Sequence, residues 1–160
     1  MKSLALLLLV FASATSVISA QPVVVIVRHA EKLADGGNDP DLSPVGRTRA
    51  ENLARILKEA KITAIFTSEF KRAQETAAPT AKEAQVLPTI VPAKDTASLV
   101  AKLRAANGTV LVVGHGDTIP NLLKSLGIDM QINIPDSDYT ELFVITPGEK
   151  PQLLRLHYPS

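Results

Sequence analysis

Arg28 and His29 follow directly on a run of five β-branched residues at positions 23–27. Such a run is typical of a strand that is buried on both faces, as in a parallel sheet. Open α/β sheets bind their ligands at the carboxyl ends of the strands. Arg presents a planar fork of donors to phosphate oxygens, and His can act as a nucleophile or base near neutral pH. The pair therefore indicates anion binding with nucleophilic chemistry, although polar residues at strand ends are often simply solvated.

Two further segments place similar residues at the same edge of the expected sheet. Arg72 lies in the first turn of a helix that follows a strand over residues 62–67. His115 follows a strand over residues 109–113, just before another helix, and these helix starts offer free N–H groups to an anion. Because parallel strands share one carboxyl edge, the sequence predicts one pocket for a doubly charged phosphoryl group. Its four members are Arg28, His29, Arg72 and His115.

Each of these residues also has a structural alternative. Arg72 could form a helix-surface ion pair with Glu69 or Glu75, and such a pair would be the favoured reading of Arg72 alone. His115 could be a turn histidine held by backbone contacts. The glycine on each side of it, Gly116 included, favours close approach of the backbone to a ligand instead. Three independent placements at one edge favour the functional interpretation.

The elements that position these residues alternate along the chain. We expect strands over residues 23–27, 62–67, 86–91, 109–113, 139–146 and 152–158, and helices over residues 43–60, 70–84, 95–106 and 118–126. This alternation predicts an α/β fold, a three-layer sandwich with a mostly parallel sheet and helices on both faces. Pro88 predicts an edge strand, and Pro79 could kink the second helix. The first helix should turn its apolar side inward, and that side comprises Val45, Leu53, Ile56 and Leu57.

Residues 1–20 resemble a signal peptide. Lys2 precedes an unbroken apolar core, and Ala20 ends a small-residue pattern that is typical of a cleavage site before Gln21. An uncleaved membrane anchor is the alternative, but the apolar core is short for a membrane span. We therefore expect residues 1–20 to be a signal peptide, residues 21–160 to form one domain, and the protein to be periplasmic or secreted.

Composition limits the classes of partner. The chain carries 17 Lys and Arg against 16 Asp and Glu, and the loss of Lys2 with the signal peptide would leave a formal net charge of zero. This balance argues against nucleic acid, or an anionic membrane surface, as the main partner. The 160 residues include no Cys, which excludes disulfides, thiolate chemistry and a lipid-modified amino terminus.

Four sequence motifs lie in a characteristic order. They are RHA at residues 28–30, DLSPVG at residues 41–46, TSEFKRAQETA at residues 67–77 and VGHG at residues 113–116. In this order, and over nearly all of the chain after residue 20, they resemble the histidine phosphatase superfamily, which includes the phosphoglycerate mutases and small phosphohistidine phosphatases. Ala30 departs from the Gly that is usual in the family, a small change that we expect to leave activity intact.

The resemblance implies a phosphomonoesterase that works through a phosphohistidine intermediate on His29. Arg28, Arg72 and His115 would hold the phosphoryl oxygens and offset the developing charge, with Gly116 beside them in substrate binding. No metal and no cofactor is implied.

The resemblance leaves the general acid open, because its position varies within the family. Asp117 and Glu31 are the first candidates, since each lies two residues from a pocket histidine, and Asp95 is the third. Each could instead be a solvated carboxylate or a helix cap.

Two other classes of function remain possible on the sequence. His29 with Glu31, and His115 with Asp117, could hold a metal in a hydrolase, although two arginines would repel a divalent cation. An exported phosphate-binding protein would need the same pocket without turnover. The short chain has no large insertion to cover the site, so a phosphorylated substrate such as a cell-envelope sugar phosphate or a phosphoprotein is expected.

Overall fold

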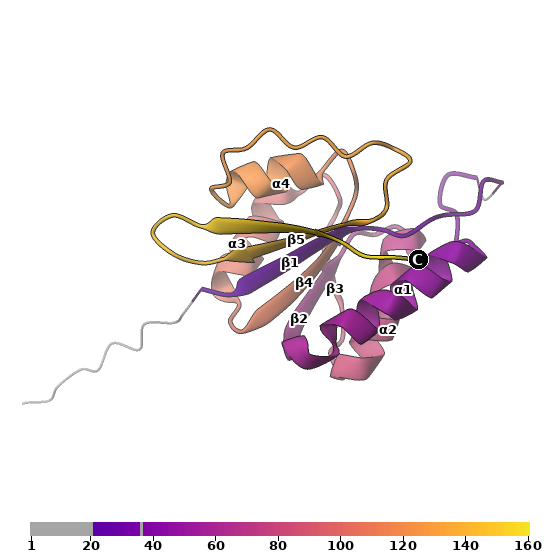
Figure 1. Ribbon diagram of the computed structural model, residues 1–160, viewed down its shortest axis with the longest axis horizontal. Helices are drawn as coiled ribbons and strands as arrows, with labels where there is room; N and C mark the ends of the chain where they lie inside the picture. The colour runs from indigo at the N-terminus through magenta and orange to yellow at the C-terminus, as the bar shows by residue number, and fades with distance from the viewer. Residues whose placement is uncertain (1–20, 36) are drawn as a thin grey trace, which may run out of the picture.

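The computed structural model describes residues 21–35 and 37–160, and these form one sheet with helices on both sides (Figure 1). The predicted signal peptide, residues 1–20, lies outside the described residues. Within the part that is described, no helix is both long and apolar enough to cross a membrane.

The order of the elements matches the expected alternation. The strands are β1 (Val23–Arg28), β2 (Ile62–Thr67), β3 (Thr89–Ile90), β4 (Thr109–Gly114), β5 (Glu141–Thr146) and β6 (Gln152–His157). The helices are α1 (Pro44–Leu57), the short 3-10 helix η1 (Lys58–Ala60), α2 (Lys71–Ala84), α3 (Thr96–Ala105) and α4 (Ile119–Ser125). The sheet order is β3-β2-β4-β1-β5-β6. The first four strands are parallel to one another, β5 is antiparallel to β1, and β6 is antiparallel to β5. The predicted fold class is confirmed.

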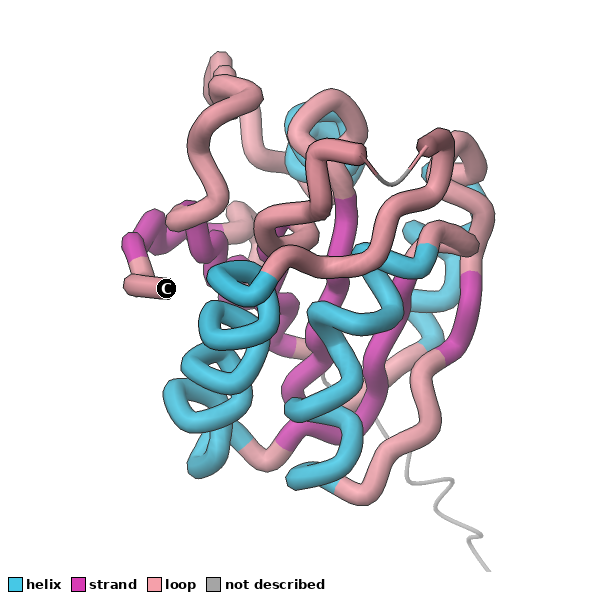
Figure 2. Tube along the Cα trace, turned by 90° about the vertical axis from the view of Figure 1, so that its right-hand side faces the viewer, coloured by secondary structure: helices cyan, strands magenta, loops and turns pink. Residues whose placement is uncertain are grey.

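The core lies in two layers because successive residues of the central strands face opposite sides of the sheet. On β1, Val25 and Val27 pack with α1 and α2, whereas Val24 and Ile26 pack with α3 and α4. Figure 2 shows two helices side by side in front of the strands, and these cover the first of the two faces. Burial on both faces explains why β1 is an unbroken apolar run.

The buried face of α1 differs from the prediction. Leu53 and Leu57 are buried as expected, but Val45 and Ile56 are half exposed, at 52% and 50%. Arg49 is buried in their place, at 5% exposed. The buried residues of α1 recur at a spacing of three or four and define its inward stripe, which comprises Gly46, Arg49, Ala50, Leu53 and Leu57.

Both prolines leave the expected order of elements intact. β3 is reduced to two residues after Pro88 and lies at the edge of the sheet, as predicted. The helix α2 continues through Pro79 for 14 residues.

The start of α1 is locked against the loop that follows β1. The Ser43 side chain accepts a hydrogen bond from the Gly46 backbone N–H at 3.1 Å and so caps the helix. The Ser43 backbone N–H donates to the Glu31 carbonyl at 2.8 Å. A Cβ on Gly46 would lie 2.1 Å from that same carbonyl oxygen, so only glycine fits. The motif at residues 41–46 therefore positions the chain just after His29.

Candidate active site

Three elements bring the four predicted pocket residues together. Arg28 pairs with Gly114 in the parallel register of β1 and β4, so the residues that follow these strand ends are neighbours. The rings of His29 and His115 have their centroids 5.2 Å apart. Arg28, His29 and His115 are buried, and the Arg72 side chain is only 15% exposed.

Backbone contacts determine the tautomer of His29. Its Nδ1 lies 2.8 Å from the Ala30 carbonyl oxygen. A carbonyl oxygen only accepts, so Nδ1 carries the proton and Nε2 keeps a free lone pair. Burial, aided by the positive charge of Arg72 and Arg28 and the nearby His115, lowers the pKa of His29 to about 3. The ring is therefore neutral and nucleophilic at physiological pH.

His115 is held by a polar side chain and an aromatic ring. Its Nε2 lies 2.8 Å from the Ser68 hydroxyl, and the Phe70 ring meets it edge-on with centroids 5.3 Å apart. Burial, followed by the charge of Arg72, lowers the pKa of His115, while Asp117 and Glu69 act in the opposite direction.

Arg28 is held mainly through Nη1, and its Nη2 lies 3.8 Å from the Asp136 carboxylate. Its Nη1 donates to the carbonyl oxygens of Pro135, Asp136 and Asp138, at 2.8 to 3.0 Å. Its Nε is buried and has no hydrogen-bond partner among the described residues, which is also true of the Nε of Arg72. Buried guanidinium donors without an acceptor are costly, and a bound anion would satisfy both.

Arg72 has a different acidic neighbour from the one expected. Its Nη1 lies 3.8 Å from the Asp39 carboxylate. The structural alternative, in which Arg72 pairs with Glu69 or Glu75, is therefore wrong. Those two carboxylates instead accept backbone N–H donors, from Ala93 and Leu42 respectively. The Asp39 carboxylate also accepts the N–H of Lys71, the first residue of α2, so this helix start does not offer all its donors to the pocket.

The segment around Arg72 is tied directly to the end of β1. The Thr76 hydroxyl accepts a hydrogen bond from the Ala30 backbone N–H at 2.9 Å and donates to the Arg72 carbonyl at 2.6 Å. Ala30 is fully buried against Leu42 and Ala50, which accommodates its extra methyl group.

The sequence and the fold are similar to those of known proteins. A profile of the histidine phosphatase superfamily (branch 1) matches residues 24–95. The protein histidine phosphatase SixA, solved with tungstate, superposes with a TM-score of 0.71 and 21% identity, over 84% of this chain and 96% of that one.

This chain resembles the histidine phosphatase superfamily, in sequence over residues 24–95 and in fold.

Other known proteins share parts of the sequence or the fold. A mycobacterial glucosyl-3-phosphoglycerate phosphatase has a TM-score of 0.65 and 16% identity, over 86% of this chain and 98% of that one. Phosphoglycerate mutase-like protein 4 of Arabidopsis thaliana is 41% identical over 61 residues. That match covers 34% of this chain and spans about a quarter (26%) of the curated relative.

Two of the three candidates for the general acid have structural partners. Glu31 forms an ion pair with Arg49 at 2.7 Å, and the Arg49 Nη1 also donates to the Tyr158 carbonyl. Burial would raise the pKa of Glu31, but the hydrogen bonds and charge of Arg49 outweigh it and leave the pKa below its usual value. Asp95 caps α3 by accepting the Ser98 N–H at 3.0 Å.

Asp117 is the candidate without such a role. It is exposed in the turn after β4, and it makes no hydrogen bond or ion pair within the described part of the chain. The N-cap of α4 is Thr118, so Asp117 does not cap this helix.

Of the two glycines beside His115, only Gly114 is required by the packing of the protein. A Cβ on Gly114 would lie 3.2 Å from the Ile119 side chain, so this position lets α4 approach the strand end. A Cβ on Gly116 would meet the Arg28 guanidinium at 3.6 Å, an ordinary contact. Neither glycine has a positive φ.

The metal alternative finds little support in the geometry of the described residues. The only group of three possible ligands among them is Asp138, Glu141 and His157, which includes neither His29 nor His115. Glu141 there pairs with Arg155, and the other two bond to Thr140.

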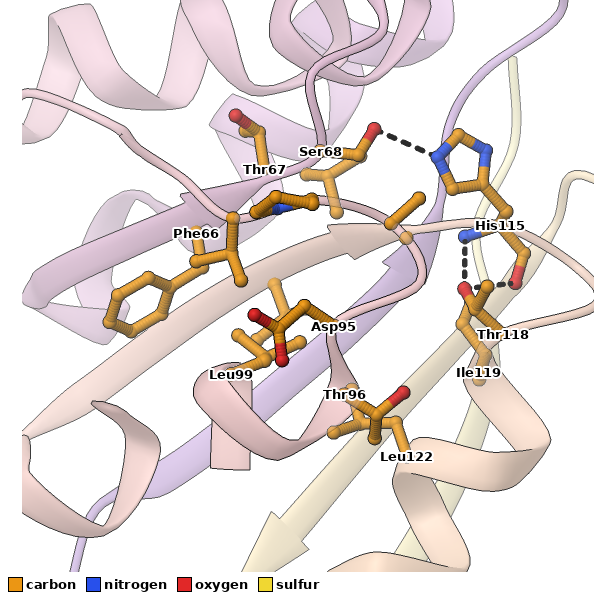
Figure 3. Close-up of a pocket in the computed structure, with 16 residues that line it drawn as sticks. Phe66, Thr67, Ser68, Asp95, Thr96, Leu99, His115, Thr118, Ile119 and Leu122 are labelled. Atoms are coloured by element: carbon orange, nitrogen blue, oxygen red, sulfur yellow. Dashed lines mark hydrogen bonds between the residues drawn. The ribbon is translucent and has the colours of Figure 1, made fainter. Parts of the chain in front are cut away.

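A mainly apolar pocket adjoins His115 on the α3 and α4 side. Figure 3 shows the Ser68–His115 hydrogen bond at one end of it and the side chains of Phe66, Leu99 and Leu122 around it. Arg28, His29 and Arg72 do not line it, so it is separate from the phosphoryl position.

Several residues of the site were not singled out from the sequence. Arg28 stacks on the Tyr139 ring with Cζ 4.4 Å from the centroid, and Arg72 stacks on the Phe70 ring at 4.3 Å. Phe70 lies within the motif at residues 67–77 and could have been noticed there. Tyr139 lies far from every motif, at the start of the last strand pair.

Proposed function

We propose that this chain hydrolyses phosphate monoesters through a phosphohistidine formed on His29. The observation that carries the proposal is the His29 Nδ1–H bond to the Ala30 carbonyl, which leaves the Nε2 lone pair free. The imidazole faces the charges of Arg28 and Arg72, and the buried Nε atoms of both have no acceptor among the described residues. A nucleophile with a low pKa beside unsatisfied cationic donors suits attack on a phosphoryl group.

The reaction would take place in two displacements. Nε2 of His29 attacks phosphorus, the N–P bond forms, and the P–O bond to the leaving group breaks with its electron pair on that oxygen. The leaving oxygen takes a proton from the general acid. Water then attacks phosphorus and gives a proton back, the N–P bond breaks, and its electron pair returns to Nε2. Arg28, Arg72 and His115 stabilise the charge on the phosphoryl oxygens in both steps.

Asp117 is the proposed general acid, and its substitution should separate two kinds of substrate. Asp117→Asn is expected to slow hydrolysis of an alkyl phosphate by about a hundredfold, since a poor leaving group needs a proton. An activated aryl phosphate leaves without one and should change by less than about twofold. Steady-state kinetics on both substrates, with Glu31→Gln and Asp95→Asn in parallel, measures this. Equal effects on both substrates, or none, would rule out Asp117.

Metal dependence distinguishes this function from its rivals. We expect hydrolysis of an aryl phosphate by the purified protein to survive EDTA and to be blocked by vanadate, because the nucleophile is His29. Loss of activity in EDTA with recovery on adding zinc would favour a metal hydrolase. Binding of inorganic phosphate with no turnover on any substrate would favour an exported phosphate-binding protein.

We propose a cell-envelope sugar phosphate or a phosphoprotein as the substrate. Two structural neighbours support these classes, since one is described as a protein histidine phosphatase and the other as a glucosyl-3-phosphoglycerate phosphatase. A panel of sugar phosphates, phosphopeptides and a phosphohistidine peptide tests this, and comparable kcat/KM values across the whole panel would contradict it.

We also propose that the protein is exported from the cytoplasm. Lys2, the apolar core after it and Ala20 indicate a cleaved signal peptide. We expect protein purified from its native host to begin at or near Gln21 and to be found outside the cytoplasm. Amino-terminal sequencing decides this, and an intact Met1 on a membrane-bound form would support the anchor.

A further inference from the structure

Tyr139 contacts two residues of the phosphate pocket from a distant part of the chain. Its ring centroid lies 4.4 Å from Cζ of Arg28 and 5.9 Å from the ring centroid of His29. The Tyr139 and His29 rings are tilted by 58°. Tyr139 is half-buried and precedes β5, and no motif of the family resemblance includes it.

The segment that ends at Tyr139 also orients the Arg28 guanidinium. Three carbonyl oxygens, those of Pro135, Asp136 and Asp138, accept from Nη1 of Arg28. The Tyr139 ring covers a face of the same group. Nη1 is therefore committed to the protein, while the buried Nε has no acceptor among the described residues.

A side-chain contact stiffens this segment. The Asp138 carboxylate accepts both the backbone N–H and the hydroxyl of Thr140, each at 2.8 Å. This local turn fixes Asp138 and Thr140, the residues on either side of Tyr139. The ring position is thus defined before any ligand binds.

We propose that Tyr139 is a positioning residue of the phosphate pocket, whose ring holds the Arg28 guanidinium in its phosphate-binding orientation and covers His29. The proposal rests on the function proposed above for Arg28 and His29. A guanidinium over an aromatic face is stabilised electrostatically and loses rotational freedom. The ring acts through these two residues and need not touch the reacting atoms.

The test compares Tyr139→Leu, which keeps an apolar side chain but removes the ring, with Tyr139→Phe, which keeps the ring. In the full chain, isothermal titration of inorganic phosphate should give a Kd about tenfold weaker for Tyr139→Leu. Tyr139→Phe should stay within about twofold of wild type. With an aryl phosphate, KM should rise in parallel for the leucine variant alone.

The pH profile provides a readout that a purely structural role would not move. Burial is the largest cause of the low pKa of His29, and the charged or titratable groups that face it are Arg28, Arg72, His115, Glu31 and Tyr139 itself. Removing the covering ring hydrates His29, so the acid limb of kcat/KM should move to higher pH in Tyr139→Leu. Urea unfolding of each variant shows whether it is folded under assay conditions.

The outcomes separate this proposal from the one on which it rests. Phosphate affinity of folded Tyr139→Leu equal to that of wild type would overturn the positioning role. A loss in Tyr139→Phe as large as in Tyr139→Leu would also overturn it, because the hydroxyl would then be responsible. If the wild type binds phosphate but has no turnover, the proposed function fails, and the Kd comparison still tests Tyr139.

Discussion

His29→Ala is expected to lower kcat on an aryl phosphate by about 10⁴-fold or more, because it removes the atom that bonds to phosphorus. Inorganic phosphate should still bind, since Arg28, Arg72 and His115 remain in place. The imidazole is oriented by the Ala30 carbonyl, a contact that involves none of the three remaining residues. Steady-state kinetics and phosphate titration on the same preparation measure the two effects.

The third histidine provides a matched control for that substitution. His157 is exposed on β6, and His157→Ala should leave kcat within about twofold of wild type. Turnover by His29→Ala at more than a few per cent of the wild-type rate would point to another nucleophile. Loss of phosphate binding in the same variant would show that His29 also supports the ground-state complex.

Arg72→Ala is expected to weaken phosphate binding and to lower kcat by about a hundred- to a thousandfold. Its guanidinium contributes a charge-assisted contact in both the ground state and the transition state, so KM and kcat should change together. Its Nε is buried without a partner among the described residues, and its only acidic neighbour within 4 Å among them is Asp39, at 3.8 Å. Kinetics on an aryl phosphate together with phosphate titration provide the measurement.

Two further variants make this result specific. Arg72→Lys should recover only part of the loss, because an ammonium group keeps the charge without the planar fork. Arg104→Ala removes an exposed arginine from α3 and should change neither constant by more than about twofold. A change in KM alone for Arg72→Ala would mean that Arg72 binds the ground and transition states equally and does not contribute to the rate.

Much of the fold could be read from the sequence because its signals are local. The β-branched run before Arg28 has the composition of a strand buried on both faces, and β1 is such a strand. The common carboxyl edge of parallel strands then places His29 beside His115 without knowledge of any side-chain contact. Ser43 and Pro44 likewise mark the start of α1 by their own chemistry.

The rest depends on contacts between segments that are distant in the chain. Glu31 appears available in the sequence, and only the fold shows that the buried Arg49 occupies its carboxylate. The inward face of α1 could not be read from apolar spacing, because a buried arginine forms part of it. Arg28 is oriented by carbonyls that lie 107 to 110 residues away, and no local pattern encodes such a contact. Residue types thus specify which groups can react, whereas packing between distant segments determines which of them are free to do so.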